Sequence, residues 1–528
     1  MVLPFGSHVV NQPPPVPDEL VGERLFQDGM ATPRPRKVRA ALAAWALALA
    51  GCAAGTPRGH ADGGAGATVT SGPDGAAGAT TTRVDAPNVA DAPGSSDGAH
   101  APTEVAVEAP LAPDARVDAS EAPLEAVVDA TTLERKMLFG YQGWFLCAGD
   151  GSPVNAWTHW FRNGVASAAN LTFDLWPDTS ELGADELFAT ELASADGTPA
   201  RLYSAYTPKT VARHFAWMRE NGIDGVALQR FLSEVQDPRF FAVRNHVAEN
   251  VRAGAEAEGR VFAVEYDLSS VDEAHLVAWL EADWKYLVDT LKVTSSPRYL
   301  KDGGKPVLYV WGLGFGDRPV TAADAATLID WLTKSADPQY RVTIVGGVPA
   351  HWRTLDGDSK TDPAWGPVYR SLDVISPWTV GRYADDAGVD AYRASSLAPD
   401  LAAANAAGKR YMPVVFPGFS WHNLNSATGA PLNQIPRRGG RLYWRQVWNA
   451  LDAGATMLKT AMFDEVDEGT AMFKVAPSAA QQPAGATFVP LDADGQALPS
   501  DFYLRLGGAA TSALRGTRPL SAMLPLPP

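Results

Sequence analysis

Short apolar runs alternate with longer stretches of helical periodicity after Thr131, and this alternation is the main structural signal in the chain. Val211, Phe215 and Met218 recur at the spacing of one helix face, and Gly222 then ends that helix. The same pattern predicts helices over residues 208–221, 246–258, 271–291, 322–334, 387–407 and 441–453. Runs with the length of buried strands cover residues 137–144, 225–229, 261–266, 307–311, 342–345, 374–376, 411–416 and 457–463.

These eight strands and their intervening helices predict an α/β domain over residues 131–517, followed by a tail over residues 518–528. We expect a (β/α)8 barrel of the TIM type with loop insertions. A doubly wound sheet alternates in the same way, so periodicity alone does not decide between the two folds. The barrel fold also predicts that the functional residues lie just beyond the C-terminal ends of the strands.

Polar and aromatic residues do collect at the ends of the predicted strands. Flat aromatic faces can stack on the apolar side of a sugar ring, and polar groups can bind its hydroxyls. Sixteen Trp in the chain fit this use and fit a large aromatic core equally well. We predict a glycan as the substrate, with substrate-binding residues Tyr141, Gln142, Trp144, Gln229, Tyr266, Asp267, Trp311, Trp378, Trp421 and His422.

The last predicted strand runs directly into an acidic run over residues 464–468, which holds four carboxylates. By composition this run could be a solvated loop, or a calcium site made of Asp464, Asp467 and Glu468. Its position after a buried strand and opposite the aromatic rim favours a catalytic site instead.

Converging carboxylates raise one another's pKa, so one acid can stay protonated near neutral pH while its neighbour ionises. Glycoside hydrolysis uses such a pair, an acid for the leaving oxygen and a carboxylate as base or nucleophile. Glu465 and Glu468 are three positions apart and could share one face of a helical turn. We therefore predict that Glu465 and Glu468 are catalytic, with Asp464 and Asp467 beside the substrate.

The acidic run resembles a motif of a known family. The stretch 462–470, in which two Glu three apart are followed by Gly-Thr, is similar to the last-strand motif of glycoside hydrolase family 99. The segments 140–145, 149–151 and 157–160 are similar to the start of these domains. Residues 498–506 resemble the end of proteins labelled family 71/99-like or xylosidase/arabinosidase. The resemblance covers about residues 133–517.

This resemblance implies a (β/α)8 retaining glycosidase, which in the better-studied branch of the family acts on α-mannosides. It implies that Glu465 assists the substrate's own 2-hydroxyl to form an epoxide-like intermediate, and that Glu468 is the general acid and then the base. Val466 and Asp467 replace the aromatic residue and the His that the family has between the two Glu. The departure removes ring contacts and adds a negative charge, so it leaves the sugar and the linkage open.

Composition excludes several other classes of protein. The formal net charge of −16 argues against nucleic-acid binding, which needs clustered Lys and Arg. The glycines of 312–316 lack the dinucleotide fingerprint, and His159, His351 and His422 lack a second His at ligand spacing. We therefore expect no cofactor and no metal, and no feature points to a protein partner.

The N-terminal region predicts export. Within residues 30–52, Arg and Lys precede an apolar stretch over 40–50, which is too short to span a bilayer. The stretch ends in Leu-Ala-Gly-Cys52, which resembles a bacterial lipobox and implies lipidation of Cys52. We expect anchoring to the cell envelope, at the outer membrane; a buried Ala/Leu helix is the alternative. Residues 1–29 are expected to be an over-called extension, with translation starting at Met30.

Residues 53–130 consist mainly of Ala, Gly, Pro, Asp, Ser and Thr and contain no aromatic residue. Such a segment buries too little apolar area to offset its ordering entropy, so it predicts a disordered linker. With Cys52 lipidated, Cys147 would be a lone, buried thiol.

Two alternatives to a retaining glycosidase fit the same sequence. One is a catalytically inactive, glycan-binding surface lipoprotein that keeps the barrel and its aromatic rim. The other is a barrel hydrolase that acts on a bond other than a glycosidic one. A serine esterase lacks its main signal, because the chain contains no Gly-x-Ser-x-Gly motif.

Overall fold

The computed structural model of the protein describes residues 127–527. The predicted extension 1–29, the signal peptide 30–52 with Cys52, and nearly all of the linker 53–130 lie outside the described residues. Within residues 127–527, no helix has the length and apolarity needed to cross a membrane.

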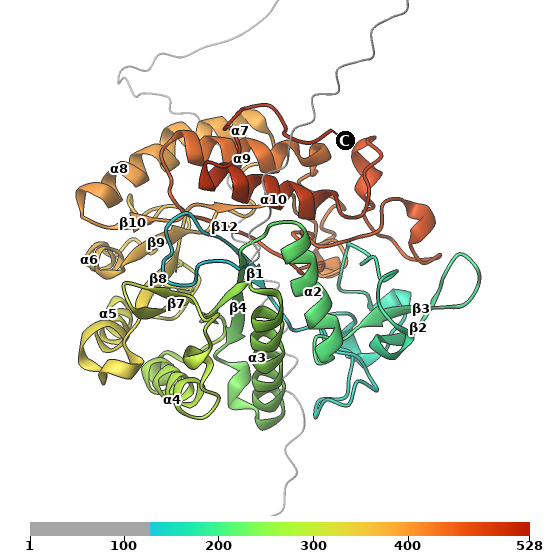
Figure 1. Cartoon of the computed structure of the whole chain (residues 1–528), viewed down its shortest axis with the longest axis horizontal. Coiled ribbons are helices and arrows are strands. Elements are labelled where there is room, and N and C mark those ends of the chain that lie inside the picture. The colour runs from blue at the N-terminus through green and yellow to red at the C-terminus, as the bar shows by residue number, and fades with distance from the viewer. Residues whose placement is uncertain (1–126, 528) are drawn as a thin grey trace, which may run out of the picture.

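Parallel strands form the centre of the domain, with helices packed around them (Figure 1). The hydrogen-bonded order is β10-β9-β8-β7-β5-β4-β1-β12-β11. The strands are β1 (Met137–Tyr141), β4 (Gly225–Phe231), β5 (Val261–Asp267), β7 (Lys305–Trp311), β8 (Thr343–Val348), β9 (Val374–Pro377), β10 (Arg410–Tyr411), β11 (Val414–Val415) and β12 (Leu458–Thr460). Each predicted strand therefore has a counterpart in the structure.

The ring closes through the segment 410–415, whose two halves are β10 and β11. β10 pairs in parallel with β9, and β11 pairs in parallel with β12. Backbone bonds continue between the halves, because Met412 N donates to Ile375 O at 2.9 Å and Lys459 N donates to Pro413 O at 3.0 Å. The strands therefore form a closed (β/α)8 barrel rather than an open doubly wound sheet, which confirms the predicted fold.

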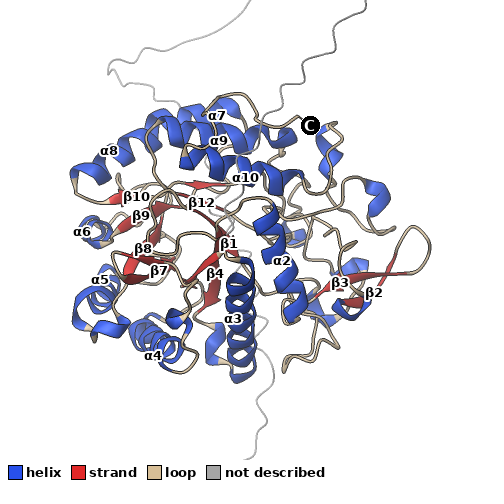
Figure 2. Ribbon diagram, in the orientation of Figure 1, coloured by secondary structure: helices blue, strands red, loops and turns tan. Residues whose placement is uncertain are grey.

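The helices surround the barrel (Figure 2). They are α2 (Pro208–Glu220), α3 (Pro238–Glu258), α4 (Leu276–Asp289), α5 (Ala322–Asp330), α6 (Trp365–Ser371), α7 (Asp386–Tyr392), α8 (Ala398–Ala406), α9 (Arg441–Asp452) and α10 (Phe502–Arg515). The single helix predicted over 387–407 is two helices, separated by a π-helical turn at Arg393–Leu397. Helix α10 was not predicted; glycines lie in its buried face, and a Cβ on Gly508 would lie 1.7 Å from Asn221 O.

The connection between β1 and α2 is a long insertion that contains the antiparallel hairpin of β2 (Leu187–Ala193) and β3 (Pro199–Tyr203). This hairpin lies beside the barrel and is hydrogen-bonded as a separate sheet (Figure 1). A shorter addition, β6 (Lys301–Asp302), pairs antiparallel with β7. Insertions were predicted, but neither strand pairing was.

An apolar layer fills the N-terminal end of the barrel, where Leu138, Ala263, Tyr309 and Met412 pack with Val128 and Leu133 from the preceding segment. Val128 N donates to Gly259 O at 2.9 Å, so the folded domain begins before residue 130, the predicted end of the linker. The predicted tail also packs on the domain: Trp444 Nε1 donates to Ser521 O at 2.9 Å.

Candidate active site

The acidic run lies at the C-terminal mouth of the barrel, immediately after β12. Residues 466–469 form a turn rather than the predicted helical turn, and the amides of Thr470 and Ala471 donate to Glu465 O at 3.1 and 2.8 Å. Gly469 has a φ of +66°, and a Cβ there would lie 2.7 Å from Ser420 N. The turn therefore depends on glycine at this position.

Asp464 ties the acidic run to the end of β1. Its Oδ1 accepts from Gln142 N at 2.7 Å and its Oδ2 from Gly143 N at 2.9 Å. Burial raises the pKa of Asp464 to about 7. Because its two oxygens accept from backbone amides of the loop that follows β1, Asp464 holds this loop and the acidic run together.

Glu465 is buried and is held by two donors. Its Oε1 accepts from Gln142 Nε2 and its Oε2 from Thr470 Oγ1, each at 2.6 Å. Burial and, next, the negative charge of Asp467 raise the pKa of Glu465 to about 8, although the two donors oppose the shift because they stabilise the ionised form. The amide nitrogen of Gln142 thus orients Glu465, while its Oε1 has no hydrogen-bond partner among the described residues.

Glu468 lies near Glu465 but has a different environment. Among residues 127–527, no side chain forms a hydrogen bond with its carboxyl group, and only its backbone carbonyl accepts, from Ser420 N at 2.9 Å. Burial raises the pKa of Glu468 well above its ordinary value, and the charges of Glu465, Asp467 and Asp267 add to the effect. The two donors on Glu465 favour its ionised form, whereas burial without such donors favours the protonated form of Glu468.

An aromatic cavity of about 310 Å³ opens beside Glu468. Trp378 and Trp421, both predicted site residues, line this cavity with Tyr383, Phe419 and Gln434. Trp311 lies next to it, with its ring 5.5 Å from the Trp378 ring in a T-shaped arrangement. The cavity therefore places several aromatic rings beside the carboxyl of Glu468.

Buried polar atoms without a partner among the described residues gather around the mouth of the barrel. They include acceptors and indole donors from several strands: Gln142 Oε1, Gln229 Oε1, Glu265 Oε2, Trp311 Nε1, Ser376 Oγ, Trp421 Nε1, Gln434 Oε1 and Asp467 Oδ1. A buried polar group without a partner costs about 1–3 kcal/mol, so such groups are rare away from functional sites. Their convergence here fits a ligand rich in hydroxyl groups.

Asp467 contacts a pair of stacked rings, His159 and Trp144. Its Oδ2 lies 3.3 Å from Nδ1 of His159, and the His159 ring stacks on Trp144 with centroids 3.8 Å apart. Burial lowers the pKa of His159 to about 3, so this His is neutral at physiological pH. The Phe231 ring also stacks on Trp144, with centroids 5.3 Å apart, and Trp144 is fully buried. Trp144 therefore packs behind the site and offers no free face to a sugar, contrary to the prediction.

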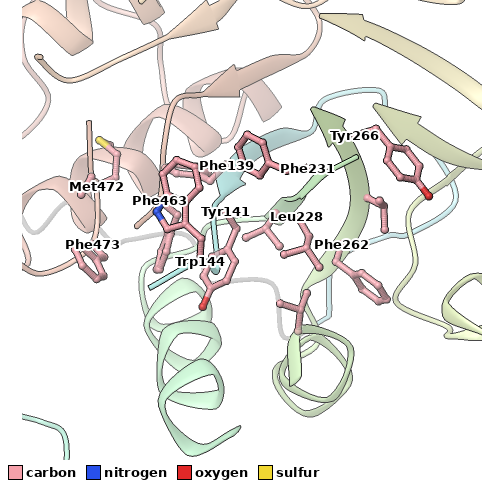
Figure 3. Packing of buried hydrophobic residues seen from close by; sticks show 14 of the residues in the cluster. Phe139, Tyr141, Trp144, Leu228, Phe231, Phe262, Tyr266, Phe463, Met472 and Phe473 are labelled. Atoms are coloured by element: carbon pink, nitrogen blue, oxygen red, sulfur yellow. The ribbon is translucent and has the colours of Figure 1, made fainter. Parts of the chain in front are cut away.

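Tyr141 and Tyr266 lie outside the site, which corrects both predictions. Figure 3 shows each ring among buried hydrophobic side chains. The Tyr141 hydroxyl lies 2.9 Å from His214 Nδ1 on α2, and the Tyr266 hydroxyl donates to Asp283 on α4 at 2.5 Å. Successive strand residues point to opposite faces, so these side chains face the helices.

Asp267 and His422 lie at the mouth but are partly engaged. Asp267 Oδ1 accepts from Ser269 N at 2.7 Å, and burial raises its pKa to about 6. His422 Nδ1 lies 2.7 Å from Ala430 O. The backbone amide of His422 donates to Asp174 Oδ2 at 2.7 Å. Asp174, which the sequence did not reveal, also accepts from Ser420 Oγ and anchors this loop.

Three further residues of the site were missed in the sequence. Lys459 and Glu265 form an ion pair inside the barrel. Arg437 holds the acidic turn, because its Nη2 donates to Gly469 O at 3.0 Å and to Ala471 O at 2.7 Å. Alternation along β5 places Glu265 on the same face as Asp267, so that signal was present in the sequence.

In the described part of the chain, no group of three or more His, Cys, Asp or Glu side chains is arranged to hold a metal ion.

Comparison with solved structures places this architecture in a known class. The chain is similar to the GH99 endo-alpha-mannosidase from Bacteroides thetaiotaomicron in complex with Bis-Tris propane, at 15% identity and a TM-score of 0.53, covering 74% of this chain and 100% of that one. A second structure of this enzyme gives 15% identity and a TM-score of 0.52, over 73% and 99% of the two chains. No family model and no curated protein matches the sequence. The likeness shows that the chain shares the barrel fold of these enzymes.

Proposed function

We propose that the protein is a retaining glycoside hydrolase that cleaves α-linked oligosaccharides or polysaccharides. The observation that carries the proposal is the pair Glu465 and Glu468: two buried carboxyls of unequal hydrogen bonding, beside an aromatic cavity and a ring of unpartnered polar atoms. Unequal environments separate the two pKa values, and this separation is what an acid–base pair requires.

Each carboxyl suits one role. Glu465 is held by Gln142 and Thr470, which favour its ionised form, so it can accept the proton of the sugar's 2-hydroxyl as that oxygen bonds to the anomeric carbon. Glu468, whose protonated form is favoured by burial, borders the aromatic cavity and can protonate the glycosidic oxygen as its bond to the anomeric carbon breaks. Glu468 then takes a proton from the water that opens the epoxide-like intermediate, and Glu465 returns its proton to the 2-oxygen. This division agrees with the roles that the family resemblance implies.

The structural neighbour supports an α-mannoside-like substrate. That protein is an endo-alpha-mannosidase, and one of its structures contains Bis-Tris propane, a polyhydroxylated diamine. The buried acceptors around the mouth of this barrel suit a ligand of comparable hydroxyl density. Asp467 adds an acceptor close to Glu465, so the preferred sugar can differ from that of the neighbour.

The test is the substitution Glu468→Gln, assayed on α-mannans, α-glucans, xylans and arabinans. Loss of the general acid should lower kcat by about 10²- to 10⁴-fold while the thermal unfolding midpoint is retained. Glu186→Gln is the matched control, because Glu186 is also buried but binds Thr210 Oγ1 at 3.1 Å, away from the acidic run. Full activity of Glu468→Gln would refute the proposed role. Glycan binding without any product from the wild type would identify an inactive binding protein instead.

We also propose that the domain is exported and lipid-anchored to the cell envelope through Cys52. The support is the lipobox-like sequence, which lies outside the described residues. Cys52→Ser should release the protein from the membrane fraction, whereas Cys147→Ser should not. Retention of Cys52→Ser on the membrane would exclude this anchor.

A further inference from the structure

A charged pair lies inside the barrel beneath the proposed catalytic acids. Lys459 on β12 forms an ion pair with Glu265 Oε1 on β5, and the side chains are 2% and 1% exposed. Replacing a buried ion pair with apolar residues of similar volume is often neutral or stabilising, so stability alone does not explain its presence. A role in binding a ligand would explain why the pair is present.

The pair adjoins the aromatic cavity. Lys459 Nζ lies 5.7 Å from the centroid of the Trp378 ring and 5.6 Å from that of Tyr309. Trp378 lines the cavity that Glu468 borders. The ion pair therefore lies next to one wall of the proposed active site.

Glu265 uses only one of its two oxygens within the protein. Oε2 is buried and has no hydrogen-bond partner among the described residues. Gln229, which faces Glu265 in the β4–β5 register, likewise has a buried, unpartnered Oε1, and Ser376 on β9 has an unpartnered hydroxyl. Two neighbouring acceptors without donors call for a ligand that supplies two donors.

The barrel is closed immediately beneath these acceptors. Tyr309 and the apolar side chains of Leu138, Ala263 and Met412 fill the next layer, and Val128 packs against them from below. A group bound at Glu265 therefore cannot continue toward the N-terminal end of the barrel.

We propose that Glu265 and Gln229 form the floor of the substrate site and accept hydrogen bonds from two adjacent hydroxyls of an uncharged sugar. Lys459 is the positioning residue, because it fixes Glu265 Oε1 and leaves Oε2 directed to the ligand. The two hydroxyls must be unsubstituted, since the apolar layer leaves no room for a further sugar. An acidic sugar is rejected, because its carboxylate would meet that of Glu265 in a water-excluded site. This proposal rests on the proposed glycan-binding function.

The experiment compares the wild type with Glu265→Gln and with the double variant Glu265→Met/Lys459→Met. Binding of neutral α-linked mannose, glucose, xylose and arabinose oligosaccharides is measured by calorimetry, and thermal unfolding is recorded for each protein. Glu265→Gln should weaken binding about 10- to 100-fold, because it removes a charged acceptor. The double variant should unfold within a few degrees of the wild type, because neither charge is left without its partner. Its affinity for the sugar should be as low as that of Glu265→Gln.

Monodeoxy analogues of the bound sugar supply a readout that a purely structural role would not affect. Removal of the hydroxyl that donates to Glu265 should weaken binding to the wild type. It should not weaken binding to the double variant, in which the carboxyl that accepts from this hydroxyl is already absent. The control is Asp283→Asn, which breaks the equally buried Arg230–Asp283 pair on the outer face of the barrel. It should lower stability and leave affinity unchanged.

Three outcomes would overturn the floor assignment. They are wild-type affinity in Glu265→Gln, recovery of both stability and affinity in the double variant, and the absence of any coupled hydroxyl. Binding is measured whether or not the sugar is cleaved, so absence of turnover refutes catalysis alone. Failure of the wild type to bind any sugar in the panel refutes both proposals.

Discussion

Thr470 offers a precise test of the acid–base assignment, because its hydroxyl donates to Glu465 Oε2 at 2.6 Å. Thr470→Val preserves the shape of the side chain and removes this donor. The remaining donor is Gln142 Nε2, so Glu465 stays in place but its ionised form loses one of two hydrogen bonds. The substitution should therefore raise the pKa of Glu465.

The size of the effect follows from the energy of the bond. A hydrogen bond to a charged group contributes about 1.5–3 kcal/mol, and one pKa unit corresponds to about 1.4 kcal/mol. The pKa of Glu465, about 8 in the intact site, should rise by about one to two units. Because the base must be ionised, activity increases as pH rises through this pKa, and the rising limb moves to higher pH in the variant.

The assay is the pH dependence of kcat/KM, which reports ionisations of the free enzyme. At a pH below the limb, the variant should be about 10- to 100-fold less active than the wild type, and the difference should shrink at higher pH. Thr460→Val is the matched control, because it removes a buried hydrogen bond with Tyr443 at 2.9 Å from β12, the strand that precedes the acidic run. It should cost about 1 kcal/mol of stability without moving the limb. A folded Thr470→Val protein with an unmoved limb would refute the role of Glu465 as base.

Three further substitutions test the positions of buried groups. Burial raises the pKa of Asp464 from 3.8 to about 7, so the stability that the neutral form provides is complete below about pH 4 and is lost as pH rises through 7. In the wild type, the free energy of unfolding should fall by about 4 kcal/mol between pH 4 and pH 8 because of Asp464, and in Asp464→Asn this fall should be absent. The same dependence of unfolding free energy on pH in both proteins would contradict the assignment. Gly469→Ala should cost about 1–3 kcal/mol and reduce kcat, because the left-handed turn and the amide of Ser420 oppose a Cβ; wild-type kcat and denaturation would show that the turn can relax. Tyr266→Phe should cost about 1–2 kcal/mol by loss of the bond to Asp283 and leave kcat/KM unchanged, whereas a large loss in kcat/KM would restore Tyr266 to the site.

The strands and the run that carries the acids could be predicted, because apolar periodicity and strand-end chemistry are local properties of the chain. The face of the strand to which each side chain points was harder to predict. Tyr266 and Asp267 are adjacent in sequence, yet only Asp267 faces the mouth of the barrel, since strand side chains alternate. Correct use of that alternation would have selected Glu265 in place of Tyr266.

Contacts made by the insertion could not be predicted from the sequence. His159 lies 308 positions from Asp467, and Asp174 lies 246 positions from Ser420. No local pattern reports such pairings, because they depend on how the loop between β1 and α2 folds over the mouth of the barrel.

The sequence by itself determined the alternation of strands and helices, the acidic run at the end of the last strand, and a resemblance that separated Glu465 from Glu468. Tertiary structure decided that the ring closes through residues 410–415, that Gln142 and Thr470 stabilise ionised Glu465, and that Lys459 meets Glu265 inside the barrel. The physical reason is that a carboxyl's proton affinity depends on burial and on donors from distant segments, which only the closed barrel brings together.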